Sequence, residues 1–589
     1  MKRCSVVKTT WITVTTGLSS LSRLSSFAAM AAVAMCAGEA LAWNGKVKIT
    51  ANTSDVGMGG TQHTCVWQTD FEAVGPTSSD TIWGRSNYSV AYLLDGGLLK
   101  FRDNCYVQAP YTQVRQTGGV FSLTSSGFRV VDRYHNENSF RGDFIYSGNA
   151  VATNAFADFT FPHCISVSDN ADIQANWINI ATEKWTNSNI VAINGGLLAA
   201  NSYDRGSSCA YFYNGGELFS SYGGHSAVFG TKTIGDEVVR VCERGGCLRI
   251  AARTTELASF REPIDKVVKT VELTAAVRDM VWPIPPAVVI TGSGSNAFAV
   301  ADWDFDTGHV TNITVLCCGE GYTDDGTTKA NFAYKKGDAL LETPLDCTLG
   351  TVRADGDFTF AMEAGGGDTA YFQAVTCTNE WRGATIIDTD RKRTITHDAA
   401  LTTSDYGHSL ATYSSSYFPY TTNIIIKSGE LIDASDSSIN PKFPSCNRLE
   451  AYSGHLARGT HRFKDVVIGG ELWLCCINKS HGYTSVLNVT NTLWVAPGAS
   501  VTNGVVVTPK VKYGTFTINN DAKVAIQDWS KLPKGKKIVA LDLSEVGTLN
   551  RKSGGPVMER SDEGILEWND TEKKLYARRH TDGFFMIFK

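Results

Sequence analysis

Three carboxylates at alternate positions, Asp302, Asp304 and Asp306, form the densest acidic cluster of the chain. On a β-strand all three would project from one face, because alternate side chains point the same way. Carboxylates grouped like this can bind calcium or supply an acid and a base for cleaving a glycosidic bond. The competing interpretation is a solvated strand that leads into the turn at residues 307–308, and we favour it. These three residues are the candidates for a metal site, and the metal itself stays unknown.

A second group of polar residues consists of His455 and His461, with Arg458 and Arg462 close to them in the sequence. Such a basic patch could grip an acidic sugar, although we favour a loop lined by these residues. The G-x-S-x-G and H-E-x-x-H signatures of familiar hydrolases are absent from the sequence. We therefore assign no catalytic residue, expect no cofactor, and leave the binding residues unassigned.

The cysteines are ambiguous: most can be small buried apolar residues, and some disulfides could form after export. Of the 15 cysteines, two lie in the first 42 residues, and an odd number remains. Cys242 and Cys247 flank a Gly-Gly turn and are the best local candidates for a disulfide. The paired C-x-x-C spacing of a structural zinc site does not occur.

The N-terminus has the form of a secretory signal peptide. Lys2, Arg3 and Lys8 precede a short apolar run over residues 27–38, and the small-x-small sequence of residues 40–42 follows. The apolar run is shorter than the roughly 20 residues needed to span a bilayer. We expect cleavage after Ala42, an extracellular or cell-surface location, and no transmembrane segment after signal removal.

Charge and composition limit the classes of partner that the chain can bind. The net charge of -5 makes nucleic acid a poor partner, because binding to its phosphates relies on basic surfaces. Charged residues make up only 19% of the chain, whereas glycine and aromatic residues are plentiful. This balance is typical of short strands joined by turns. The candidate partners are glycans or components of a host or cell surface.

A repeated motif carries the fold prediction: Gly-Gly, any residue, Leu, any residue and usually an apolar residue. Its leucines are Leu99, Leu198, Leu218, Leu248 and Leu472, with a weaker copy at Leu431. Glycine permits the turn, and the alternation that follows sends one face of a strand inward. We predict that Leu218 faces the core and that Glu217 faces solvent.

The intervals between copies fit a solenoid. The glycines at 195, 215 and 245 are spaced at lengths typical of one coil of a repeat protein. We predict an all-β chain that forms a parallel β-helix (β-solenoid) with a small inserted β module. A multi-domain β-sandwich is the alternative, because the spacings are irregular.

Residues 285–323 differ from the rest of the chain. They contain Pro-Pro-Ala-Val-Val-Ile, a Gly-rich turn, Thr-Gly-His-Val and Gly-Glu-Gly-Tyr-Thr in that order. This order resembles a repeat module of large bacterial and phage surface proteins. The Asp-Asp-Gly at residues 324–326 departs from that pattern. The resemblance implies a small β unit with a structural or display role, and no chemistry.

A pattern of short predicted strands separated by turns continues over residues 493–526. This pattern resembles the passenger domains of autotransporter-like surface proteins. We accordingly expect a secreted, non-catalytic, passenger- or adhesin-like bacterial surface protein. The alternative is a polysaccharide-active lyase or hydrolase on a β-helix scaffold, whose acidic and basic residues would be dispersed over neighbouring coils. The predicted domains are a signal peptide (1–42), an N-terminal solenoid (43–280), an inserted module (281–350), a C-terminal solenoid (351–540) and a C-terminal cap (541–589).

Overall fold

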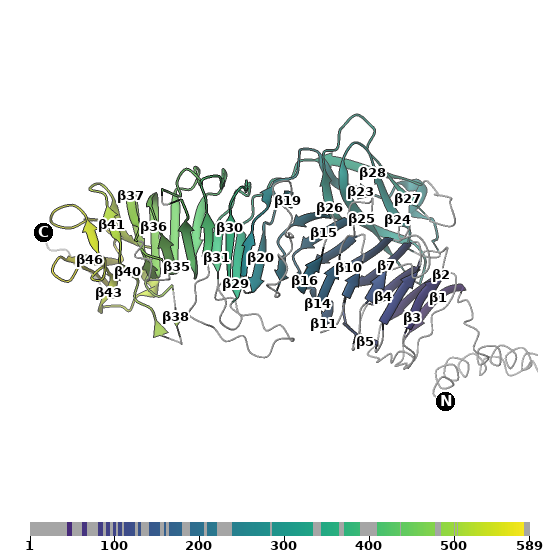
Figure 1. Ribbon diagram of the computed structural model, residues 1–589, viewed down its shortest axis with the longest axis horizontal. Coiled ribbons are helices and arrows are strands. Elements are labelled where there is room, and N and C mark those ends of the chain that lie inside the picture. Colours follow the sequence, from purple (N-terminus) through teal and green to yellow (C-terminus); the bar gives the residue numbers. More distant parts are fainter. Residues whose placement is uncertain are drawn as a thin grey trace, which may run out of the picture. The chain divides into compact units, whose positions relative to one another are not determined.

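A computed structural model provides the structure of the chain (Figure 1). It describes residues 44–49, 62–67, 80–85, 90–94, 98–101, 104–108, 111–123, 128–130, 141–153, 158–160, 164–179, 189–204, 209–220, 238–251, 253–282, 285–304, 306–333, 343–363, 370–388, 409–435, 437–476, 484–499, 501–502 and 505–581. The predicted signal peptide and the glycine pair of the first repeat lie outside these residues.

The all-β class predicted from the sequence is confirmed. Most of the described residues lie in strands. The helices among them are the four-residue α3 (Ala275–Arg278) and the three-residue 3₁₀ helix η3 (Trp529–Lys531). Within the described part of the chain, no helix is long and apolar enough to span a membrane. The chain divides into two compact units, one holding mainly residues 1–220 and 263–352 and the other mainly residues 221–262, 353–394 and 399–589.

The first unit contains three series of parallel strands. In each series every strand pairs with the next one in the list. One series is β1 (Asn44–Ile49), β2 (Gln62–Trp67), β4 (Val90–Leu94), β7 (Tyr111–Gln116), β10 (Arg141–Tyr146), β13 (Cys164–Ser168), β15 (Asn189–Asn194) and β17 (Cys209–Tyr213). Another is β5 (Leu98–Phe101), β8 (Val120–Leu123), β11 (Val151–Thr153), β14 (Asp172–Asn179), β16 (Leu197–Asp204) and β18 (Glu217–Ser220). The third is β3 (Asp80–Arg85), β6 (Asn104–Gln108), β9 (Phe128–Val130) and β12 (Asp158–Thr160), which also pairs with β14.

Two copies of the glycine repeat stack directly on each other in this unit. Leu198 in β16 lies opposite Leu218 in β18, and both side chains are 0% exposed. The prediction that Leu218 faces the core is therefore confirmed. The prediction for Glu217 is wrong, because this side chain is only 9% exposed. Its partner in β16, Leu197, is also buried, so both faces of the sheet are covered at this row.

The glycine repeats form turns at most of their described positions. Gly195, Gly215 and Gly245 have φ values of 117°, 89° and 67°, in the region that only glycine adopts without strain. Gly469 is an exception, because it lies inside the long strand β36 (Thr460–Trp473). A Cβ atom there would lie 2.5 Å from Cδ1 of Tyr452. Glycine at this position serves close packing rather than a turn.

The first unit also holds an antiparallel six-stranded sheet. Its order is β23 (Val267–Glu272), β28 (Thr343–Gly350), β27 (Lys329–Ala333), β24 (Ala287–Thr291), β25 (Ser295–Trp303) and β26 (Val310–Glu320). Its own core includes Val268, Trp282, Trp303 and Phe332. The Asn194 amide donates to the carbonyl of Leu316 at 2.6 Å and so joins β15 to β26.

The second unit repeats the parallel arrangement along two long series (Figure 1). The first is β20 (Gly246–Ala251), β29 (Phe358–Glu363), β31 (Thr385–Asp388), β33 (Asn423–Ile426), β35 (Arg448–Ala457), β36, β37 (Val486–Val495), β42 (Lys523–Ile526) and β45 (Val557–Met558). The second is β21 (Arg253–Glu256), β30 (Ala370–Ala374), β32 (Ser409–Thr412), β34 (Glu430–Asp433), the later parts of β35 and β36, β40 (Lys510–Lys512) and β43 (Lys537–Asp542).

A third series completes this unit. In it, the first part of β36 pairs with the first part of β37, β37 pairs with β41 (Thr515–Ile518), and β41 pairs with β44 (Thr548–Asn550). Outside this series, β19 (Val238–Val241) pairs with β22 (Ser259–Arg261). β38 (Val501–Thr502) and β39 (Val505–Val506) form a small antiparallel pair. β46 (Gly564–Asn569) and β47 (Lys574–Arg579) pair antiparallel, and β47 continues onto β43.

Candidate functional site

Asp302, the first of the predicted metal candidates, is a packing residue of β25. Its carboxylate accepts hydrogen bonds from Nη2 of Arg115 at 2.7 Å and from Oγ1 of Thr314 at 2.8 Å. The amide of Asn312 donates a third at 3.2 Å. Because Arg115 belongs to β7, the ion pair joins the antiparallel sheet to the parallel strands of its own unit.

Asp304 and Asp306 do not join Asp302 in a metal site. The carboxylate of Asp304 accepts hydrogen bonds from the backbone and the hydroxyl of Thr307, at 2.6 and 2.7 Å, and so stabilises the turn. Asp306 is exposed beside that turn. Within the described ranges, no group of three His, Cys, Asp or Glu side chains is arranged to hold a metal ion. The geometry agrees with a strand that leads into a turn.

Cys242 and Cys247 lie at a turn, as the sequence predicts. The backbone N–H of Gly245 donates to the carbonyl of Cys242 at 2.9 Å, and β20 begins at the next residue. Both cysteine side chains are buried. A disulfide between them stays a prediction.

The predicted patch of histidine and arginine is divided between the inside and the outside of the second unit. His461 is 0% exposed, whereas His455 lies half-buried on the outer face of β35. The prediction of one basic patch is wrong, because the alternation of β36 turns His461 inward between Thr460 and Arg462, which are exposed.

His461 belongs to a buried polar cluster with Asp433 and Lys442. The Lys442 ammonium donates to Oδ1 of Asp433, and the two side chains are 3% and 0% exposed. Although burial acts to raise the pKa of Asp433, hydrogen bonds from Lys442 and Ser435 hold it below its usual value. Burial lowers the pKa of His461 to about 4, against the opposing charge of Asp433. This cluster is a neutral imidazole beside a buried ion pair.

The outer face of the second series carries a row of three side chains, and His455 is the member to which the sequence pointed. His455, Trp473 and Lys512 lie opposite one another on the adjacent strands β35, β36 and β40. Leu472 and Val511, which lie opposite each other one position earlier on β36 and β40, are both fully buried and form the matching inner row. In-register parallel pairing therefore places the three outer side chains side by side.

Aromatic contacts fix this row. The ring centroids of His455 and Trp473 are 4.7 Å apart, and Nδ1 of His455 lies 3.0 Å from the carbonyl oxygen of Cys475. The ring of Tyr513 meets Trp473 edge to face at 5.7 Å, and the indole N–H donates to Oε2 of Glu471 at 3.2 Å. We call His455, Trp473, Lys512 and Tyr513 the aromatic row.

Charged groups of both signs border the aromatic row. The Lys512 ammonium lies 5.3 Å from the centroid of the Trp473 ring, as in a cation–π contact. It also lies 3.3 Å from Oε2 of Glu471 and 3.7 Å from Oε2 of Glu545. Hydrogen-bond acceptors therefore flank a central donor beside the rings.

Tyr513 occupies an unusual backbone conformation. Its φ is 60° and that of Gly514 is 52°, so two successive residues are left-handed between β40 and β41. Asparagine is enriched at such left-handed positions, whereas a bulky side chain is rare there. The turn nevertheless presents a tyrosine that is 36% exposed.

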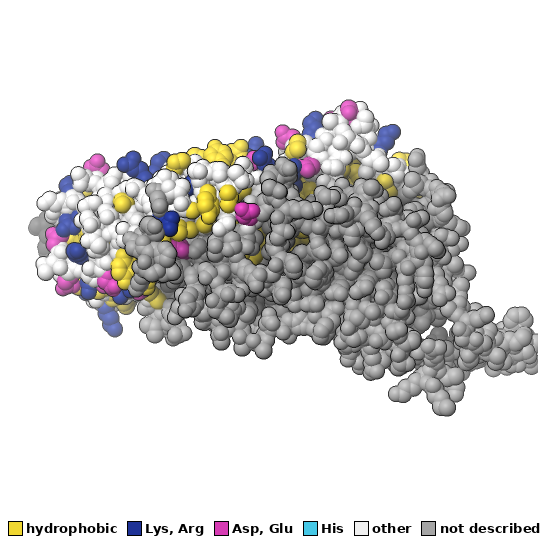
Figure 2. Space-filling view, in the orientation of Figure 1, with side chains coloured by type: hydrophobic (Ala, Val, Ile, Leu, Met, Phe, Trp, Pro, Cys, Tyr) yellow, Lys and Arg dark blue, Asp and Glu magenta, His cyan; other side chains and the backbone are white. Residues whose placement is uncertain are grey.

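A second exposed aromatic cluster lies in the same unit. Tyr417 and Tyr420 are 44% and 39% exposed, and the guanidinium of Arg382 lies 4.2 Å from the centroid of the Tyr420 ring. Glu262 holds that guanidinium through an Nη2–Oε1 distance of 2.6 Å. Figure 2 shows apolar side chains gathered along the upper part of this unit, above the positions that Figure 1 labels β30 and β31.

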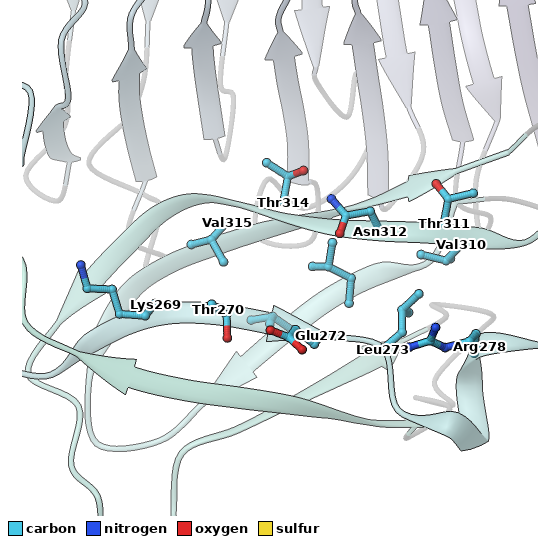
Figure 3. A pocket seen from close by; sticks show the side chains of 12 residues that line it. Lys269, Thr270, Glu272, Leu273, Arg278, Val310, Thr311, Asn312, Thr314 and Val315 are labelled. Atoms are coloured by element: carbon cyan, nitrogen blue, oxygen red, sulfur yellow. The ribbon is translucent and has the colours of Figure 1, made fainter.

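An open groove lies between β23 and β26, the two outermost strands of the antiparallel sheet (Figure 3). Its volume is about 730 Å³. Lys269 and Arg278 lie toward opposite ends, with Glu272 between them in Figure 3. Thr314 and Asn312 from its wall are engaged with Asp302. The groove is polar and of mixed charge.

Comparisons with known proteins give no match: no family model, curated protein or solved structure resembles the chain.

The sequence held a signal for the aromatic row. Trp473 occupies the outward position of a glycine repeat, between Leu472 and Leu474, where both leucines point inward. Tyr513 precedes a glycine at the end of an alternating strand. What the sequence could not supply is the register that brings residues 455, 473 and 512 together.

Proposed function

We propose that the protein is an exported, non-catalytic surface protein of passenger or adhesin type, built as a parallel β-solenoid that carries an inserted antiparallel module. The supporting observation is the cyclic order of the strand series in the second unit. A strand of the first series is followed by one of the second, as β29 by β30, β31 by β32 and β33 by β34. A chain wound in coils produces this order.

The pairing direction favours the solenoid over the β-sandwich alternative. Strands of a sandwich pair antiparallel. The strands of the three series in each unit pair parallel, and antiparallel pairs occur in the six-stranded sheet, at β38–β39 and around β46–β47. Buried pairs such as Leu431 with Leu456 and Leu472 with Val511 would then form the continuous core that neighbouring coils share.

A display role fits the outer charges better than the alternative of a polysaccharide-cleaving enzyme. A retaining or inverting glycosidase needs two carboxylates flanking the bond that it cuts. Beside the aromatic row, the carboxylates of Glu471 and Glu545 lie 3.3 and 3.7 Å from the same ammonium, that of Lys512, so both are paired with a cation. The pair of Glu471 on β36 and Lys512 on β40 joins oppositely charged side chains of adjacent strands, which stabilises their pairing.

Export and binding are tested separately. The full chain is produced in a bacterium, and the extracellular and surface fractions are analysed by N-terminal sequencing, with Trp43 expected as the first residue. Cells that display the chain are expected to adhere to glycan-coated surfaces, and the purified protein is expected to leave the glycans uncut. Protein with an intact Met1 in the exported fraction would refute export. Reducing ends or unsaturated products that accumulate with the protein would favour the enzyme.

A further inference from the structure

We propose that the aromatic row of the second unit is a binding site for neutral oligosaccharides built from pyranose rings. The inference deepens the proposed function by naming the ligand class, and its biological meaning rests on that function. A pyranose has a C–H face and a rim of hydroxyls. Aromatic rings offer a negatively polarised face to C–H groups, and Tyr513 provides the most exposed ring of the row.

The polar border of the row suits hydroxyl groups. Carboxylates of Glu471 and Glu545 accept hydrogen bonds, and the Lys512 ammonium donates them from the space between. The border carries two carboxylates and one ammonium, which argues for a neutral sugar over a phosphate, a polyanion or a nucleic acid. A stable protein partner would need roughly 800 Å² on each side, more than a row of three rings provides.

The rings are also held in place before any ligand arrives. Trp473 is fixed between His455 and Tyr513, and its indole N–H is bound to Glu471. A carbonyl oxygen lies within hydrogen-bond distance of the imidazole of His455. A rigid aromatic platform loses little conformational freedom when a ligand binds, which favours affinity.

The backbone of Tyr513 gives the second, independent reason. A bulky side chain at positive φ is strained, and such strain persists where the surrounding structure or a function requires it. Asparagine tolerates the left-handed backbone of this position better than tyrosine does. The chain therefore keeps an exposed tyrosine ring at a position whose left-handed backbone disfavours a bulky side chain.

The test uses the purified full chain with cellohexaose, maltohexaose and hexa-N-acetylchitohexaose as neutral probes and an oligogalacturonide as an acidic probe, measured by calorimetry. At least one neutral probe is expected to bind, and both Trp473→Ala and Tyr513→Asn are expected to weaken it at least tenfold. Tyr513→Asn is expected to keep or raise the melting temperature. Tyr420→Asn, a matched change at the other exposed aromatic cluster, is expected to leave affinity unchanged.

Several results would overturn the proposal: no neutral probe binds, the oligogalacturonide alone binds, or Tyr513→Asn retains full affinity. Loss of affinity together with a lower melting temperature in Tyr513→Asn would assign the ring to packing and count against the proposal. Export and surface adhesion are measured independently, so a failure here is distinguishable from a failure of the proposed function.

Discussion

Acid should destabilise the strands around His461, β34, β36 and β37, at a pH at which the rest of the second unit is still stable. The folded chain holds the pKa of His461 at about 4, compared with 6.5 for a free imidazole, chiefly because the ring is buried. Between these two pH values the unfolded segment binds a proton that the folded segment excludes. Stability is therefore complete above pH 6.5 and is lost as the pH falls from about 6.5 to about 4.

The size of this loss follows from the shift in pKa. A tenfold change in proton affinity corresponds to about 1.4 kcal/mol, so a fall from 6.5 to about 4 corresponds to about 3 kcal/mol. Asp433 acts in a lower range, because its folded pKa lies below its usual value and its contribution is lost as the pH falls through that folded value. Between pH 6.5 and 4.5 the imidazole therefore dominates.

Hydrogen exchange at several pH values, corrected for the intrinsic exchange rate, measures the local opening free energy of β34, β36 and β37. Opening is expected to become easier by about 3 kcal/mol toward pH 4, and His461→Leu is expected to abolish most of that dependence. His455→Leu, on the outer face, serves as the matched control and should keep it. Equal pH dependence in wild type and His461→Leu would refute the reasoning.

Three further changes probe packing. Leu218→Ala should cost about 2–5 kcal/mol and loosen chiefly the strands paired with β18, as hydrogen exchange would show; uniform loosening of both units would contradict this. Lys442→Met should cost about 3–5 kcal/mol by leaving Asp433 charged and buried, and Lys442→Met with Asp433→Leu should recover most of it in denaturant melts. Gly469→Ala should lower the melting temperature because its Cβ would meet Tyr452, and Tyr452→Ala should relieve the effect; a neutral Gly469→Ala would show that the rings have room to move.

The strand content and several turns were predictable because they depend on local chemistry. Gly195 and Gly215 require positive φ, and the leucines that follow alternate inward, so a short window of sequence is enough. Glu217 was predicted incorrectly because its exposure depends on what covers the outer face of the sheet. That cover comes from elsewhere in the chain and leaves no mark on the local pattern.

Candidate sites were harder to predict than turns. The spacing of Asp302, Asp304 and Asp306 suggested a cluster. The carboxylate of Asp302 is instead paired with Arg115, which lies 187 residues away in the sequence. The aromatic row shows the reverse problem: residues 455, 473 and 512 have no regular spacing, and only the pairing register brings them together. Irregular loop lengths between strands hide such rows from any search by period.

The antiparallel sheet is inserted in the sequence between strands that pair with each other in the parallel series. Contacts of Glu262 help to keep that pairing continuous. β20 and β21 precede the sheet in the chain, yet they pair with β29 and β30, which follow it. Glu262, the last residue before the excursion, accepts a hydrogen bond from the backbone of Ala354 at 3.1 Å and pairs with Arg382 at 2.6 Å. The carboxylate of Glu262 thus connects the residue at which the chain leaves the parallel strands with the segment in which it rejoins them. Since stacked strands depend mainly on their immediate neighbours, closing this gap is enough for the series to continue across an insertion of about 90 residues.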